Sequence, residues 1–130
     1  MNKNELLNYI TSTYNVEGEY PFDNDHVAFR HLIGRKIFAL FLDVPESKFG
    51  LKGDRIIKIV NVKCNPFMIG DFLQKEGFFP AYHMNKTHWL SIDIERASEN
   101  EIKLLIDFSY LLTEKKIKRG KGWFLRFKVL

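Results

Sequence analysis

Residues 80–93 read PAYHMNKTHWLSID, and this stretch decides how the chain is expected to fold. The pattern predicts an extended run over residues 80–84 and a turn at the polar residues 85–87. From residue 88 onward, apolar residues alternate with polar or aromatic ones, which is typical of a strand with one buried face. The apolar set contains Leu90, Ile92 and Ile94, whereas Trp89 lies on the more polar face. The stretch therefore predicts a β-hairpin whose second strand is half buried.

A second hairpin is expected nearer the start of the chain. Residues 27–32 and 36–42 read as strands around Gly34, because glycine supplies the positive φ that a tight turn needs. Residues 56–64 predict a third strand in this part of the chain. Residues 43–54 contain one proline and two glycines, and we expect a mobile connection there.

Three helices complete the predicted order. We expect them to begin after Asn2, Asn65 and Ser98, because asparagine and serine side chains accept hydrogen bonds from free amides of a first turn. Glu5 and Glu101 each follow three residues after their cap, which is the spacing of a capping box. The third helix is the most apolar and should lie across the sheet.

The order of these elements indicates the fold class. Strands joined by short turns pair antiparallel, and helices bury their apolar stripes on a sheet. We therefore predict an α+β two-layer sandwich, with an antiparallel sheet of about five or six strands and helices mainly on one face. The folded domain is expected over residues 1–114. Residues 115–130 are a basic extension, whose alternating residues 123–130 could add an edge strand.

Composition narrows the classes of protein. The chain has 130 residues and one cysteine, and no apolar run approaches the roughly 20 residues of a membrane span. We expect a monomeric cytoplasmic protein without a membrane partner. Seven of the 20 basic residues lie at or after Lys115, where no acidic residue occurs. The remaining 13 basic residues face 16 acidic ones, so the net charge of +4 does not by itself indicate a nucleic-acid-binding core.

Four segments together resemble the MmcQ/YjbR family of small bacterial proteins. They are YPFD at 20–23, GRKIFA at 34–39, VKCNP at 62–66 and PAYHMNKTHW at 80–89, and the helix IDFSYLL at 106–112 also fits. The resemblance covers roughly residues 1–114. It implies a CyaY-like fold, similar to frataxin, and a DNA-binding role with a double-wing motif. Asn65 stands where the family usually has an acidic residue, and the tail lies outside the resemblance.

The chain offers little for catalysis, metals or cofactors. His83 and His88 are five residues apart, and no four-ligand zinc spacing is present. Cys64 alternates with buried valines, which is typical of an inert thiol. We found neither a glycine-rich phosphate loop nor a nucleophile motif in the sequence. We therefore expect no catalytic residue, no metal ligand and no cofactor.

The candidate binding residues lie at the two hairpin turns. They are Arg35 and Lys36 at the first, and His83, Asn85, Lys86, His88 and Trp89 at the second. Cations at two tips could meet the phosphates of duplex DNA, while Asn85 could bond a base edge. The basic tail could add phosphate contacts through counterion release. The alternative is a protein- or small-molecule-binding domain that uses the surface of Tyr82, His83 and Trp89.

Overall fold

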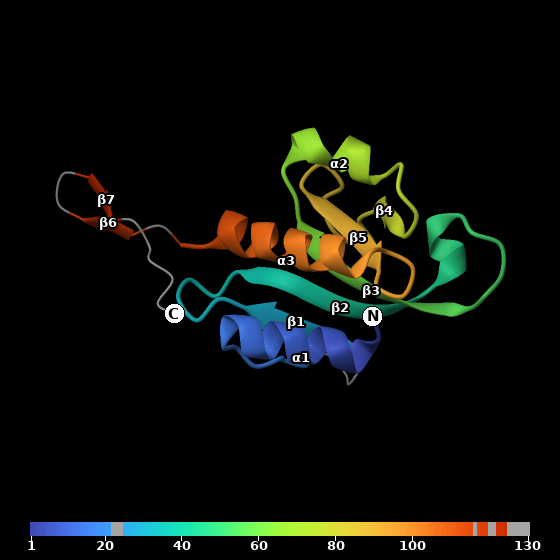
Figure 1. Cartoon of the computed structure of the whole chain (residues 1–130), viewed down its shortest axis with the longest axis horizontal. Coiled ribbons are helices and arrows are strands. Elements are labelled where there is room, and N and C mark those ends of the chain that lie inside the picture. Colours follow the sequence, from blue (N-terminus) through green and yellow to red (C-terminus); the bar gives the residue numbers. More distant parts are fainter. Residues whose placement is uncertain (22–24, 116, 120–121, 125–130) are drawn as a thin grey trace.

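The computed structural model describes residues 1–21, 25–115, 117–119 and 122–124, and shows a sheet with helices packed on it (Figure 1). Its helical elements are α1 (Lys3–Tyr14), the short 3₁₀ helix η1 (Glu46–Phe49), α2 (Pro66–Phe72) and α3 (Glu99–Thr113). Its strands are β1 (Val27–Arg30), β2 (Ile37–Pro45), β3 (Ile56–Lys63), β4 (Phe78–Pro80), β5 (Trp89–Asp93), β6 (Ile117–Arg119) and β7 (Gly122–Phe124).

The main sheet has five antiparallel strands in the order β1-β2-β3-β5-β4. β6 and β7 pair only with each other among the described strands, and the remainder of the expected edge strand, residues 125–130, lies outside the described residues. The α+β two-layer class expected from the sequence is confirmed. None of the helices in the described ranges is long and apolar enough to cross a membrane.

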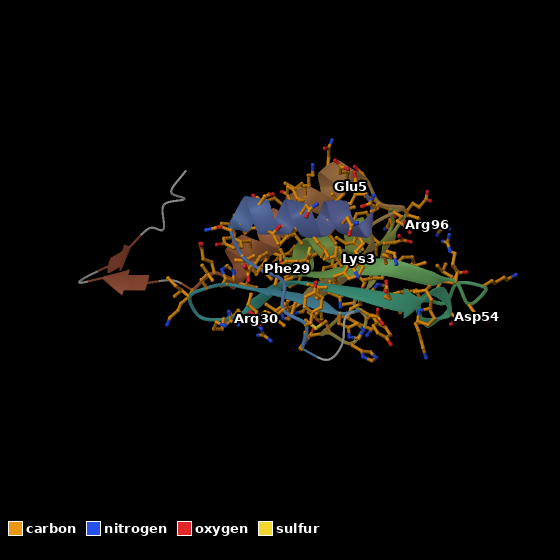
Figure 2. The ribbon with its side chains drawn as sticks, turned by 90° about the horizontal axis from the view of Figure 1, so that it is seen from below. Lys3, Glu5, Phe29, Arg30, Asp54 and Arg96 are labelled. Atoms are coloured by element: carbon orange, nitrogen blue, oxygen red, sulfur yellow. The ribbon has the colours of Figure 1, made fainter. Side chains whose placement is uncertain are left out.

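One face of the sheet is covered by helices. Leu6 and Ile10 of α1 and Leu105 of α3 belong to one buried cluster with residues of all five strands. Figure 2 shows α1 along this side of the sheet, with Phe29 of β1 beneath it. The first helix begins as expected, because Asn2 and Glu5 exchange both hydrogen bonds of a capping box.

The third helix begins where the sequence predicts, but its predicted capping box is wrong. Ser98 occupies the cap position without a capping hydrogen bond from its side chain. The carboxylate of Glu101 instead accepts a hydrogen bond from Lys75. An ion pair with another segment has therefore replaced a local interaction.

The opposite face of the sheet is covered by connections. Leu42, Val44, Ile57 and Ile59 are buried there, with Phe49 and Tyr82 packed against them. Phe49 belongs to η1, which follows β2 directly. The expectation of a mobile connection over 43–54 is therefore wrong at its start, because residues 43–45 continue β2 and residues 46–49 turn back over the sheet.

The quoted stretch forms a hairpin with different bounds from those expected. Its first strand is β4, which ends at Pro80, so residues 81–88 form the connection instead of residues 80–84 being extended. Leu90, Ile92 and Ile94 are fully buried, as predicted. Ser91 and Asp93 are buried as well, because the second face of β5 is also covered. The strand is therefore buried on both faces.

Candidate nucleic-acid interface

The two connections that carry the candidate residues leave the sheet at the same end. Ala39 near the start of β2 pairs with Val62 near the end of β3. Val62 pairs in turn with Leu90 near the start of β5, and Leu90 pairs with Pro80 at the end of β4. Residues 31–36 precede β2, and residues 81–88 connect β4 to β5. The antiparallel register therefore places two turns that are far apart in sequence at the same end of the sheet, with β3 between the strands that carry them.

The first connection, residues 31–36, presents cations beside an apolar tip. Leu32 and Ile33 are 70% and 50% exposed, and Gly34 and Arg35 both have positive φ. Arg35 forms an ion pair with Glu19, whose carboxylate also lies 3.3 Å from Nε of Arg30. Part of the positive charge expected at this turn is therefore neutralised. Lys36 is exposed and has no ion pair within the described residues.

A buried histidine anchors this connection to the helix layer. His31 is 3% exposed, and its Nε2 lies 2.8 Å from Oγ1 of Thr113 in the last turn of α3. Its ring packs on Tyr110, which also stacks on Tyr14 with ring centroids 4.5 Å apart.

The pKa of Tyr14 is raised well above its ordinary value. Burial of the side chain is the main cause, and the neighbouring Tyr9 and Asp107 raise this pKa further.

The second connection, residues 81–88, is a compact turn. The side-chain oxygen of Asn85 accepts a hydrogen bond from the amide of Thr87, and its backbone oxygen accepts from the amides of His88 and Trp89. Asn85 therefore shapes the turn, and this side-chain oxygen already has a partner. His83, Asn85, Lys86 and His88 are exposed, whereas Trp89 is half-buried. The structure thus exposes the predicted polar residues of this connection along one edge of the molecule.

A buried polar network holds the start of this connection. Asn61 and Ser91 are fully buried on adjacent strands, and the hydroxyl of Ser91 donates to the Asn61 side-chain oxygen. The Asn61 amide donates to the carbonyl of Tyr82 at 2.9 Å, and the Tyr82 amide donates to Ser91 Oγ at 2.9 Å. Because buried polar groups are costly without partners, the network fixes the backbone of Tyr82.

The residues of this network were not among those predicted from the sequence. The only signal was a polar side chain in the middle of the apolar strand IIKIVNVK, at Asn61. Lys48 and Phe49 were not predicted either, because residues 43–54 were expected to be mobile.

Burial raises the pKa of the Cys64 thiol, so this cysteine is a poor nucleophile. Within the described ranges, no group of three or more histidine, cysteine or acidic residues is arranged to hold a metal ion.

Comparisons with known proteins agree with one another. The family model described as YjbR matches residues 11–112. The uncharacterised protein YyaQ of Bacillus subtilis (strain 168) is 32% identical over 117 residues, which is 88% of this chain and 99% of that protein.

Solved structures give the same result. A crystal structure of a Pseudomonas syringae protein has a TM-score of 0.85 at 33% identity, covering 88% of this chain and all of that one. A crystal structure of Deinococcus radiodurans protein DR2400 has a TM-score of 0.60 at 20% identity, covering 81% of this chain and 75% of that one, and shows the shared fold alone.

Proposed function

The chain belongs to the YjbR family, and from that premise we propose that it binds double-stranded DNA through the two connections at one end of its sheet. The observation that carries the proposal is the register of the sheet, which places residues 31–36 and 81–88 at the same end. Two turns at one end can each contact the backbone phosphates on one side of a DNA groove.

The roles of the residues follow from their exposure and charge. Lys36 and Lys86 are exposed and form no ion pair within the described residues, so they are the principal phosphate contacts. Arg35 shares Glu19 with Arg30 and contributes less. His83 and His88 are exposed and add ring nitrogens that can form hydrogen bonds. Trp89 is half-buried at the start of β5, so we assign it a supporting role instead of base recognition.

Salt dependence is the sharpest test of this proposal. Binding of a fluorescein-labelled duplex should weaken steeply as salt rises, because each phosphate contact releases counterions. Lys36→Ala and Lys86→Ala should each reduce the slope of log affinity against log salt by about one unit. Fluorescence anisotropy over a salt series measures both the affinity and the slope.

Two controls separate the connections from other cations. Lys52 is exposed in the connection between η1 and β3, two residues before Asp54. Figure 2 shows Asp54 and Arg30 at opposite ends of the sheet. Lys52→Ala should therefore leave the slope unchanged. A variant with Lys121, Arg126 and Lys128 changed to Gln removes cations of the tail. A slope that falls only in this last variant, or no duplex binding even at low salt, would refute the proposal.

A further inference from the structure

A hollow of about 280 Å³ lies between η1 and the start of the 81–88 connection. Its walls come from two segments that are more than thirty residues apart in the chain, and include Lys48, Phe49, Pro80, Tyr82, His83 and Lys86. Pockets for small ligands span roughly 300–1,000 Å³, and this hollow lies just below that range, so it suits only a small ligand.

The hollow has aromatic walls. The Phe49 ring lies 4.7 Å from the Phe79 ring and 6.0 Å from the Tyr82 ring, measured between centroids. On Tyr82 the exposed imidazole of His83 stacks nearly parallel, with centroids 3.9 Å apart and an angle of 13° between the planes. The structure therefore shows the Tyr82 ring already stacked with a planar nitrogen heterocycle.

The aromatic wall is fixed before any ligand arrives. Both the amide and the carbonyl of Tyr82 are bonded to the buried side chains of Ser91 and Asn61. Phe49 is held on the sheet by its contact with the core residues of the second face. A preorganised wall lowers the entropic cost of binding a rigid flat ring.

The charge around the hollow has one sign. Lys48 and Lys86 line it, and among the residues that the structure describes no acidic side chain does so. Neither lysine forms an ion pair within the described part of the chain, whereas Lys58, Lys75 and Lys103 each have an acidic partner. Unpaired lysines beside a hollow favour an anionic ligand, and a phosphate accepts several charge-assisted hydrogen bonds.

We propose that this hollow binds a nucleoside monophosphate, with the base replacing the exposed His83 imidazole on the Tyr82 ring beside Phe49 and the phosphate on Lys48 and Lys86. Stacking accepts every base, so the site discriminates bases weakly. The same chemistry is offered by a free nucleotide and by the terminal nucleotide of a single strand. The site shares Lys86 with the proposed duplex contact, but Lys48, Phe49 and Tyr82 belong to the hollow alone, so the two proposals can be tested separately.

Calorimetric titration of the full chain tests the ligand. AMP, GMP, CMP and UMP should bind with similar affinity, whereas adenosine and inorganic phosphate alone should each bind about tenfold or more weaker. A short single strand with a 5′ phosphate, compared with the same strand bearing a 5′ hydroxyl, identifies the source. Tighter binding of the phosphorylated strand than of the monophosphates assigns the site to strand ends, and the reverse order assigns it to free nucleotides.

Substitutions test the site itself. Lys48→Gln should weaken AMP binding about tenfold, since a charge-assisted contact is lost, and Tyr82→Leu should weaken it by a similar factor while keeping an apolar side chain. Lys52→Gln is the matched control, being an exposed lysine close in sequence that does not line the hollow.

The outcomes separate this site from the duplex site. Absence of binding by all four monophosphates, or binding that Lys48→Gln and Tyr82→Leu leave unchanged, would overturn the proposal. Lys48→Gln should not alter the salt slope for duplex DNA, and Lys36→Ala should not alter AMP binding. Failure of one proposal is therefore distinguishable from failure of the other.

Discussion

The connections at residues 31–36 and 81–88 leave the same end of the sheet, yet they are built differently. The first has an exposed apolar tip at Leu32 and Ile33, and its Arg35 is paired with Glu19. The second exposes Lys86 without an ion pair among the described residues and carries the stacked rings of Tyr82 and His83. Sharing one end of the sheet therefore does not give the two connections the same binding capacity.

Their anchors differ as well. The first connection is held through His31, which packs on aromatic and ionisable groups of the helix layer. The second is held by Asn61 and Ser91, which are neutral and buried in the sheet. Substitutions and pH should therefore affect the two connections separately.

The largest effect is expected from removing the neutral anchor. Asn61→Ala leaves the Tyr82 carbonyl and the Ser91 hydroxyl with fewer partners inside the protein, and should lower the free energy of unfolding by about 2–4 kcal/mol. Urea unfolding measures this loss. Hydrogen exchange should accelerate at the Tyr82 amide and not at the His31 amide, which bonds to the Lys36 carbonyl.

Asn8→Ala is the matched control for this substitution. Asn8 is exposed on α1, so the change should alter the free energy of unfolding by no more than about 0.5 kcal/mol. If Asn61→Ala cost as little, the network would not be the anchor of the second connection.

A smaller effect is expected from alkaline pH, acting through the helix layer behind the first connection. The pKa of Tyr14 is raised in the folded chain, so the folded state keeps this proton longer than the unfolded state does. The stability that Tyr14 contributes is fully present below the unfolded pKa of about 10 and is lost as the pH rises above it. The loss should be at most about 1.4 kcal/mol per pH unit for this single proton.

Comparison with Tyr14→Phe isolates this proton. Burial also raises the pKa of the Cys64 thiol, which destabilises the fold in the same direction at high pH but is present in both proteins. Urea unfolding from neutral pH to about pH 11 should therefore show a flatter decline for Tyr14→Phe. Equal declines in the two proteins would show that Tyr14 titrates alike in the folded and unfolded chains.

The smallest effect on stability is expected from releasing the paired arginines. Glu19→Gln removes the carboxylate that holds Arg30 and Arg35, and because both side chains of the Arg35 pair are well exposed, the free energy of unfolding should change by less than about 1 kcal/mol. The affinity for duplex DNA should rise about threefold or more at low salt, and the salt slope should steepen by up to about one unit.

Glu46→Gln provides the comparison for that variant. It releases Arg55 from an ion pair in the connection beside Asp54, at the other end of the sheet. Anisotropy should show unchanged duplex affinity for Glu46→Gln. An equal gain in both variants would indicate a general charge effect and would remove the distinction between the two ends.

Local patterns in the sequence predicted most of the elements. The capping residues Asn2 and Asn65 and the alternation at Leu90 and Ile92 depend on neighbours a few residues away, and the structure confirms them. The errors arose where distant segments intervene. Ser91 and Asp93 look like a solvent-facing side of β5, yet connections on the second face bury them.

The candidate site was predictable only in part. The sequence indicated the exposed cations Lys36 and Lys86, because turns between apolar strands lie at the surface. It could not indicate that Glu19 neutralises Arg35, or that Phe49 packs near Tyr82, since each pair joins separate segments of the chain.

By itself the sequence determined the α+β class, the family and the presence of two cation-bearing turns. Short-range periodicity and capping are sufficient for the class, and the residues of the quoted segments are sufficient for the family. The tertiary structure decided which charges remain unpaired, which side chains anchor the turns and where a hollow remains. Those properties depend on the packing of segments that are distant in the chain, and no local pattern encodes that packing.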